Sequence, residues 1–277
     1  MRLGAPLPQT IIDPEQWVAA VQAKGYRAAY CPLSGKEDSA TIRAFELAAE
    51  QAGIVIAETG AWSNPLSPDE AIRRAALEKC QAMLALADEV GARCCVNIAG
   101  SLGEKWDGPH PADLTPGTFG LIVDTTRAII DAVRPKRTFY TLEPMPWMYP
   151  DSIESYEDLI RAIDRSQFGV HFDPVNLINS PMRYFFNGDF VRDFITRLGP
   201  AIRSVHAKDI HLQDKLTVHL DEVRPGLGEL NYRTLLRELD RLEPDLPVML
   251  EHLPLASEYD LAAAYVHGVA DEIGVTL

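Results

Sequence analysis

Four polar residues stand at the ends of four short apolar segments in the second half of the chain. They are Glu143 after Thr-Phe-Tyr-Thr-Leu, Asp173 after Gly-Val-His-Phe, His206 after Ile-Arg-Ser-Val, and Glu251 after Leu-Pro-Val-Met-Leu. Carboxylate oxygens and imidazole nitrogens are ligands for divalent metal ions, and carboxylates also transfer protons. These residue types therefore predict a metal site at which acid–base chemistry takes place.

The apolar segments are typical of buried parallel strands, which read as nearly continuous hydrophobic runs. Their polar ends lie 30, 33 and 45 residues apart. One strand–helix–strand unit takes about 30 residues or more, so each polar end can belong to a consecutive strand. The strands of a (β/α)8 barrel end at one mouth, where active sites lie. We therefore expect an α/β fold, a single-domain (β/α)8 TIM barrel over residues 1–277, with the metal site at the ends of strands five to eight.

The rest of the chain alternates expected strands and helices in the same way. Four further strands are expected at 2–7, 26–31, 54–57 and 93–98. Helices are expected at 14–24, 39–52, 67–90, 116–133, 152–165, 189–198, 232–242 and 258–273. Asp13 before Pro14 is a helix start signal, and Gly53 and Gly91 are stop signals. Loops are expected at 58–65, at 104–115 as a possible active-site lid, and at 212–231.

Composition narrows the class of protein. The chain has 47% hydrophobic and 24% charged residues, as soluble globular proteins do. Its net charge of −14 argues against a nucleic-acid or anionic-membrane partner, because both require a basic surface. No segment approaches the roughly 18 apolar residues of a membrane span. The four cysteines form no CxxC pair, so we expect reduced thiols in a cytoplasmic protein.

The ligand types also indicate which ion and which reaction to expect. Three carboxylates with one imidazole suit one divalent metal ion, Mn²⁺ first, with Mg²⁺, Co²⁺, Zn²⁺ and Fe²⁺ as alternatives. Such an ion would bind a carbonyl and a neighbouring hydroxyl of a small sugar or keto-sugar and acidify the adjacent C–H. Glu143 and Glu251, on well-separated strands, could face opposite sides of that carbon as the catalytic acid–base pair. The expected intermediate is an enediolate.

Four other residues are candidates for contact with the substrate. Lys208 lies two positions beyond His206 and should point into the mouth, to bind a substrate oxygen or to form a salt bridge with Asp209 or another barrel carboxylate. Asn176 is a candidate hydrogen-bond donor to the substrate, and Trp62 is either a sugar-stacking surface or an anchor of its loop. His171 should point inward one layer below Asp173, as support for a ligand or as a hydrogen-bonded core residue.

At these residues the chain resembles the xylose isomerase-like TIM-barrel superfamily, the sugar isomerase/epimerase group that also contains endonuclease IV. The resemblance covers most of the chain. Its most specific pieces are Leu-Glu143-Pro, His-Phe-Asp173-Pro-Val-Asn, Val-His206-Ala-Lys208-Asp209, Pro-Gly226-Leu-Gly-Glu-Leu-Asn-Tyr and Met-Leu-Glu251-His. It implies that Glu143, Asp173, His206 and Glu251 hold one metal ion and that the two glutamates exchange the proton. By analogy it also implies a homodimer or homotetramer.

The chain departs from this group at the substrate shell. Many members have a histidine where Asn176 stands, and the epimerases carry a glutamate and an arginine where this chain has Tyr149 and Leu212. A metal-dependent sugar isomerase or epimerase is the first interpretation, and a lyase or dehydratase acting on a keto-sugar, inosose or 3-keto-glycoside is the alternative. An endonuclease-like enzyme and a non-catalytic binding subunit are weaker alternatives.

Overall fold

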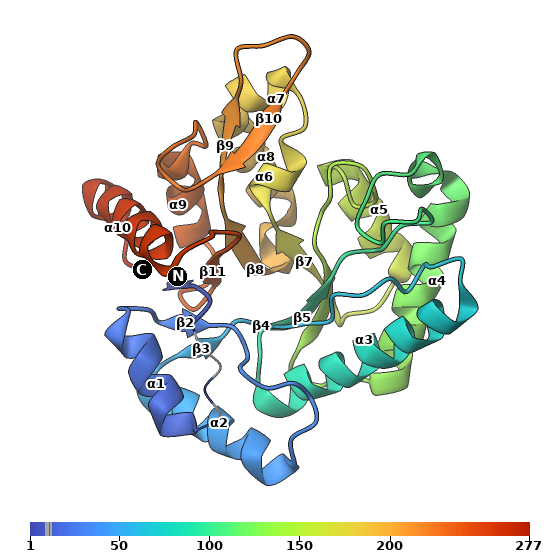
Figure 1. Ribbon diagram of the computed structural model, residues 1–277, viewed down its shortest axis with the longest axis horizontal. Coiled ribbons are helices and arrows are strands. Elements are labelled where there is room, and N and C mark those ends of the chain that lie inside the picture. The colour runs from blue at the N-terminus through green and yellow to red at the C-terminus, as the bar shows by residue number, and fades with distance from the viewer. Residues whose placement is uncertain (9–10, 12) are drawn as a thin grey trace.

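Residues 1–8, 11 and 13–277 are described by the structure, a computed structural model. A parallel sheet curls into a barrel, and the long helices surround it (Figure 1). The strand order is β3-β2-β1-β11-β8-β7-β6-β5-β4. The bounds are β1 Arg2–Gly4, β2 Ala28–Ala29, β3 Val55–Ile56, β4 Glu58–Gly60, β5 Cys94–Asn97, β6 Phe139–Leu142, β7 Phe168–Phe172, β8 Ile202–Ala207 and β11 Pro247–Leu250. The predicted α/β TIM barrel is confirmed.

The barrel closes at Ala57, the residue that separates β3 from β4. Its N–H donates to the Ala29 carbonyl at 2.8 Å, and its own carbonyl accepts from the Cys94 N–H at 3.3 Å. β3 pairs with β2, and β4 pairs with β5. Thus β3 and β4 are one strand with a break, and together they fill the third of eight strand positions. The predicted end of this strand at residue 57 and the predicted loop from Glu58 were wrong, because the strand continues to Gly60.

The helices follow the expected pattern closely. They are α1 Pro14–Ala23, α2 Ser39–Ala52, α3 Glu70–Val90, α4 Pro116–Val133, α5 Ile153–Ile163, α8 Asn187–Leu198, α9 Tyr232–Asp240 and α10 Ala256–Ile273, with short α6 Pro174–Leu177 and α7 Pro181–Phe185. Asp13 caps α1 by accepting from the Gln16 N–H at 2.8 Å. Gly53 and Gly91 end α2 and α3 with φ of 65° and 75°, a conformation that favours glycine. None of the helices in the described ranges combines the length and hydropathy needed to cross a bilayer.

An antiparallel hairpin occupies part of the segment 212–231, where a loop was expected. It consists of β9 Asp209–Leu212 and β10 Leu220–Val223, and it projects from the barrel near α7 (Figure 1). Its base is fixed by the buried carboxylate of Asp209, which accepts from the backbone N–H groups of Ile210, Gly226, Gly228 and Leu230 at 2.9–3.1 Å. A Cβ on Gly228 would lie 2.3 Å from the Ile210 carbonyl oxygen. The loop therefore requires glycine at this position.

The barrel interior becomes more polar toward the mouth. Near its base, Ala28, Ala57 and Met249 form a small apolar cluster, and a Cβ on Gly4 would lie 2.8 Å from the Met249 Cε. Above this cluster lies His171, which is fully buried and whose ring centroid is 4.1 Å from that of His206. Since alternate strand residues share a face, Met249 and Glu251 mark successive interior layers. The ligand-type residues therefore stand on a packed floor.

Candidate metal and active site

The structure brings the four predicted ligands together at the C-terminal ends of the strands. Glu143 follows β6, Asp173 follows β7, His206 lies in β8, and Glu251 follows β11. One ligand atom from each lies within 4.8 Å of the others. All four side chains are buried, and the most exposed, Glu251, shows 8% of its surface. A group of three carboxylates and one imidazole gathered in this way is a candidate divalent-metal site.

His206 lies between two sets of carboxylates and contacts each with a different nitrogen. Its Nδ1 is 2.9 Å from Glu251 Oε1 and 3.3 Å from Glu143 Oε1. Its Nε2 is 3.0 Å from Glu58 Oε1. With an ion bound and Nε2–H donating to Glu58, Nδ1 would give up its proton, and its lone pair would point toward the ion and the other carboxylates. This is the arrangement in which histidines hold metal ions.

Glu58 is the main site residue that sequence reasoning missed. Its second oxygen, Oε2, is 3.1 Å from His171 Nε2, so one carboxylate joins two histidines. Strict alternation after the inward Ala57 would turn Glu58 outward, toward the helices. The break at Ala57 turns it inward instead, and Thr59 then points outward to donate to the Met83 carbonyl on α3. Irregularities of this kind commonly re-aim side chains next to active sites.

Lys208 places its ammonium group among the ligand carboxylates. Its Nζ is 2.7 Å from Glu251 Oε1 and 2.9 Å from Asp173 Oδ2, and only 1% of the side chain is exposed. Asp209, the other partner considered, instead accepts backbone N–H groups of the hairpin loop. Asn176 completes this contact set: its Nδ2 donates to Glu143 Oε1 at 3.0 Å, and its Oδ1 is 3.4 Å from Lys208 Nζ.

The donor atoms fit a divalent cation. Asp173 Oδ2 and Glu251 Oε1 are fully buried, yet neither makes a hydrogen bond of acceptable geometry to the described residues. The nearby Lys208 and His206 nitrogens satisfy the distance but not the angles of a hydrogen bond. Lys208 is the one lysine or arginine in the described part of the chain that faces both of these oxygens, and a divalent ion bound by the same group would offset the remaining negative charge of the three carboxylates. Both atoms face the same space as Glu143 Oε1 and His206 Nδ1, so the four residues can hold one ion.

The protein's own charges move the pKa values of the two glutamates in opposite directions. Burial alone would raise the pKa of Glu251, but the adjacent His206 and Lys208 outweigh burial and lower that pKa. Burial raises the pKa of Glu143, and the negative charge of Glu251 adds to this effect against the attraction of His206. Burial would likewise raise the pKa of Glu58, but His206 and His171 lower it. Divergent pKa values in a carboxylate pair are typical of acid–base sites.

The hairpin contributes a second group that sequence reasoning missed. Glu222 of β10 lies 3.4 Å from Lys208 Nζ through Oε2 and 3.2 Å from His252 Nδ1 through Oε1. His252 Nε2 is in turn 3.6 Å from Glu251 Oε2. These contacts tie the hairpin to the carboxylate pair. Glu222 was missed because its segment was expected to be a loop.

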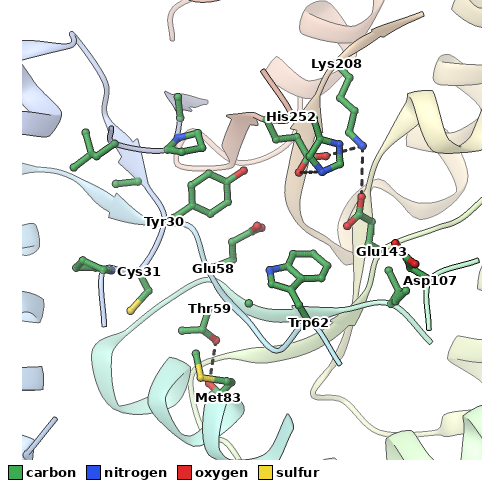
Figure 2. Close-up of a pocket in the computed structure, with 18 of the residues that line it drawn as sticks. Tyr30, Cys31, Glu58, Thr59, Trp62, Met83, Asp107, Glu143, Lys208 and His252 are labelled. Carbon is green, nitrogen blue, oxygen red and sulfur yellow. Dashed lines mark hydrogen bonds and ion pairs between the residues drawn. The ribbon is translucent and has the colours of Figure 1, made fainter. Parts of the chain in front are cut away.

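A large cavity of about 1200 Å³ opens above these residues. Glu58, Glu143, Lys208 and His252 line it, together with the predicted substrate residues Asn176 and Trp62 (Figure 2). Trp62 is 38% exposed and folds back over Gly60, where a Cβ would lie 2.2 Å from the indole Nε1. The fourth predicted substrate residue, His171, is not among the lining residues described; it contacts Glu58 and His206 below the cavity floor.

Several solved structures share this fold. The probable 3-DHS dehydratase AsbF of Bacillus anthracis has a TM-score of 0.72 at 18% identity, covering 98% of this chain and 99% of that one. D-psicose 3-epimerase of Clostridium cellulolyticum H10, solved with D-tagatose, has 0.70 at 14% identity, covering all of both chains. A xylose isomerase-like TIM barrel protein of Mycobacterium smegmatis, in complex with magnesium, has 0.68 at 16% identity, covering 98% and 96%.

Sequence comparison places the chain in a family. Among curated proteins, no sequence matches it significantly. The sequence model of one family, described as xylose isomerase-like TIM barrel, matches residues 17–267. That match spans most of the 277 residues and includes all four ligand-type residues and Glu58. The chain therefore belongs to the xylose isomerase-like TIM barrel family.

Proposed function

We propose that this protein is a divalent-metal-dependent isomerase or epimerase that moves a proton next to the carbonyl of a small sugar or keto-sugar. The observation that carries the proposal is the convergence of Glu143, Asp173, His206 and Glu251 within 4.8 Å on the floor of a large cavity. Two of these groups are glutamates on strands separated by β7 and β8 in the sheet. They therefore approach a bound substrate from different sides.

The ion would be held by Glu143 Oε1, Asp173 Oδ2, His206 Nδ1 and Glu251 Oε1. Mn²⁺ is the first candidate, and Mg²⁺, Co²⁺, Zn²⁺ and Fe²⁺ are the alternatives, since oxygen-rich sites with one imidazole suit these ions. The Mycobacterium smegmatis protein of the same fold was solved in complex with magnesium, which supports a divalent ion here. Such an ion, when bound, would act as a Lewis acid that polarises the substrate carbonyl.

The two glutamates have distinct positions for handling the proton. Their Oε1 atoms both lie next to His206 Nδ1, and if these atoms hold the ion, the Oε2 atoms remain to accept and return a proton. Either glutamate can remove the proton while the other returns it. Asn176 holds Glu143 by a 3.0 Å hydrogen bond, and Lys208 holds Glu251 and Asp173 in register.

Elimination by a lyase or dehydratase is the second candidate. It begins with the same proton removal but ends with loss of a leaving group next to the carbon that lost the proton. His252 favours this candidate, because it lines the cavity beside Glu251, has 60% of its side chain exposed, and could donate a proton to a departing oxygen. The solved structure of a probable dehydratase with the same fold also supports it.

Proton exchange with solvent tests both candidates. The protein is incubated in D₂O with Mn²⁺ and a panel of ketoses, inososes and 3-keto-glycosides, and each reaction is quenched with EDTA before ¹H NMR. Deuterium next to the carbonyl with a new isomer supports the epimerase or isomerase. Loss of water or of an aglycone supports the lyase or dehydratase. No exchange with any carbonyl compound contradicts proton abstraction and returns the question to the endonuclease-like and non-catalytic interpretations.

A further inference from the structure

We propose that the substrate is an unphosphorylated keto-sugar that carries an apolar, ring-shaped substituent. This inference rests on the proposed function for the sugar part. The substituent would lodge in what we call the apolar annex, the part of the cavity lined by Leu7, Ile11, Leu33, Trp62, Met83 and Ile98. The annex belongs to the first half of the barrel, whereas the reacting groups belong to the second half.

Size is the first argument. The cavity of about 1200 Å³ exceeds the range of roughly 300–1000 Å³ typical for sites that enclose a whole small ligand. A single sugar ring held at Glu143 and Glu251 would leave much of this volume to water against apolar side chains. Apolar surface facing water is a binding opportunity, worth about 25 cal/mol for each Å² that a ligand covers. The unused volume therefore indicates a second part of the substrate.

The chemistry of the annex indicates that this second part is apolar. Three polar groups that border it already have partners in the protein: Thr59 donates to the Met83 carbonyl at 2.9 Å, the Lys79 ammonium to the Trp62 carbonyl at 3.0 Å, and the Ser34 hydroxyl to Glu37 at 2.8 Å. A second sugar ring would bury more hydroxyl groups than the remaining Trp62 N–H can bind, which costs free energy. An aromatic or other apolar ring carries no such penalty.

Trp62 stands where the two parts of the substrate would meet. In Figure 2 its indole extends into the cavity between Glu58 and Glu143, on the side of Thr59 and Met83. Gly60 makes this position possible, because a Cβ there would collide with the indole. Among the described residues, no hydrogen bond holds the indole Nε1, so both the ring face and the N–H remain for a ligand. A flat aromatic surface suits contact with a second ring.

The cations of the cavity argue against a phosphate group. No arginine is among its described lining residues. Its lysines are engaged: Lys208 with Glu251 and Asp173, Lys79 with the Trp62 carbonyl, and Lys105 with Asp107 at 3.2 Å. Phosphate binding needs cations or backbone N–H groups directed at the phosphate oxygens.

A set of matched substrates tests the inference. The kcat/KM for solvent deuterium exchange is compared for a 3-keto-glucoside with a phenyl aglycone, the same sugar with a methyl aglycone, a 3-keto-disaccharide, and a 6-phosphorylated ketose. We expect the phenyl compound to exceed the methyl compound at least about tenfold, because part of a ring leaves water. A disaccharide or phosphorylated compound that reacts faster than the phenyl compound would overturn the proposal.

Variants locate the effect. Leu33→Asn places a polar group in the annex and should lower the phenyl-to-methyl ratio of kcat/KM to near one. Met83→Gln, which keeps the side-chain length, gives the same test if the first variant does not fold. Leu47→Asn on α2, whose Leu47 is 37% exposed and lies outside the cavity, is the matched control and should keep the wild-type ratio. An unchanged ratio in Leu33→Asn and Met83→Gln would contradict the annex as the binding place.

A binding experiment separates this inference from the proposed reaction. Phenyl and methyl β-glucosides lack the carbonyl and cannot exchange a proton, so the difference between their affinities, measured by calorimetry with Trp fluorescence as a second readout, reports the annex. Tighter binding of the phenyl glucoside without exchange of any keto compound would leave the annex standing and remove the proposed reaction. Equal affinities of the two glucosides together with exchange of keto compounds would keep the proposed reaction and contradict the annex.

Discussion

The two halves of the barrel differ in what their strand ends carry. In the second half, β6, β7, β8 and β11 each lead to a charged or ligating side chain, and Lys208 lies among them. In the first half, the loops after the strands supply mainly apolar cavity wall, including Leu7 and Leu33. The comparison teaches that, under the proposed function, reaction and recognition would occupy consecutive parts of the chain. The surface that contacts a substituent can therefore change without moving the ligand set.

Glu58 is the exception that joins the halves. It comes from β4 in the first half, yet both of its oxygens contact histidines of the second half, His171 and His206. The first half therefore also orients a ligand. Substitutions in the second half should change the rate of proton exchange, and substitutions in the annex should change the preference for a substituent. A substitution that changes both together would contradict the division between the halves.

The largest effect is expected from Glu251→Gln. The amide cannot accept the substrate proton, so kcat for deuterium exchange should fall by about 10²–10⁴-fold. NMR after an EDTA quench measures the rate, and thermal melting checks that the variant is folded. Glu50→Gln, an exposed position on α2, is the matched control. Exchange at the wild-type rate in Glu251→Gln would remove Glu251 from the reaction.

Lys208→Met should lower stability strongly. It leaves the buried Asp173 and Glu251 carboxylates without the ammonium group that contacts them, and breaking a buried ion pair costs about 3–5 kcal/mol. Urea unfolding in EDTA measures the loss, and added Mn²⁺ should recover part of it, because ligand binding stabilises the folded state. Lys24→Met removes the exposed pair with Asp260 and should change stability by less than about 1 kcal/mol. Equal losses in both variants would contradict a special role for Lys208.

Glu58→Gln should weaken ion binding by about 10–100-fold, the usual cost of removing the carboxylate that orients a metal-binding histidine. Glutamine has one acceptor oxygen, so it cannot accept from both His171 and His206. Competition with a chromogenic chelator measures the affinity, and ¹⁵N NMR of the His206 ring reports which nitrogen carries the proton. If the His206 tautomer and the ion affinity are both unchanged, Glu58 does not orient His206 for ion binding. Glu50→Gln again serves as the control.

The smallest effect concerns the rim of the apolar annex, where Glu37 accepts from Ser34, Gly35 and Lys36. Burial alone would raise the pKa of Glu37, but these hydrogen bonds lower it from 4.5 to about 2. A carboxylate with a lowered pKa stabilises the folded state above its unfolded pKa, and this contribution is lost as pH falls from about 4.5 toward 2. NMR titration should show the Gly35 amide shifting with the Glu37 carboxyl. A titration midpoint near 4.5 would contradict the hydrogen bonds from the 34–36 segment as the cause of a lowered Glu37 pKa.

The candidate site could be predicted at the positions where a ligand-type residue ends an apolar strand. Glu143, Asp173, His206 and Glu251 each end an apolar run, so counting strands was enough to place them at one mouth, and Lys208 followed from alternation. Glu58 also follows a short apolar run, so the same rule could have found it. It was missed because the segment from Glu58 was assigned to a loop, and because strict alternation after Ala57 would have turned its side chain outward.

Other parts of the fold depend on contacts that no local pattern encodes. The hairpin at β9 and β10 is positioned by the four backbone N–H groups that donate to Asp209. Glu222 reaches the site only because the hairpin exists. The annex combines side chains from four separate loops and a helix, each ordinary in its own segment. Such surfaces emerge only when the barrel closes.

The anchoring of the hairpin at Asp209 has a consequence for how this protein can be altered. The base is held next to Lys208, while the tip at Leu216 is 99% exposed. Chain length between Gln213 and His219 can therefore vary without changing the register of the base. This makes the tip a natural attachment point for a fluorophore or a fused reporter. A label there would report movement of the hairpin. Because Glu222 of the hairpin contacts Lys208, the label would also report binding in the cavity without touching the reacting groups.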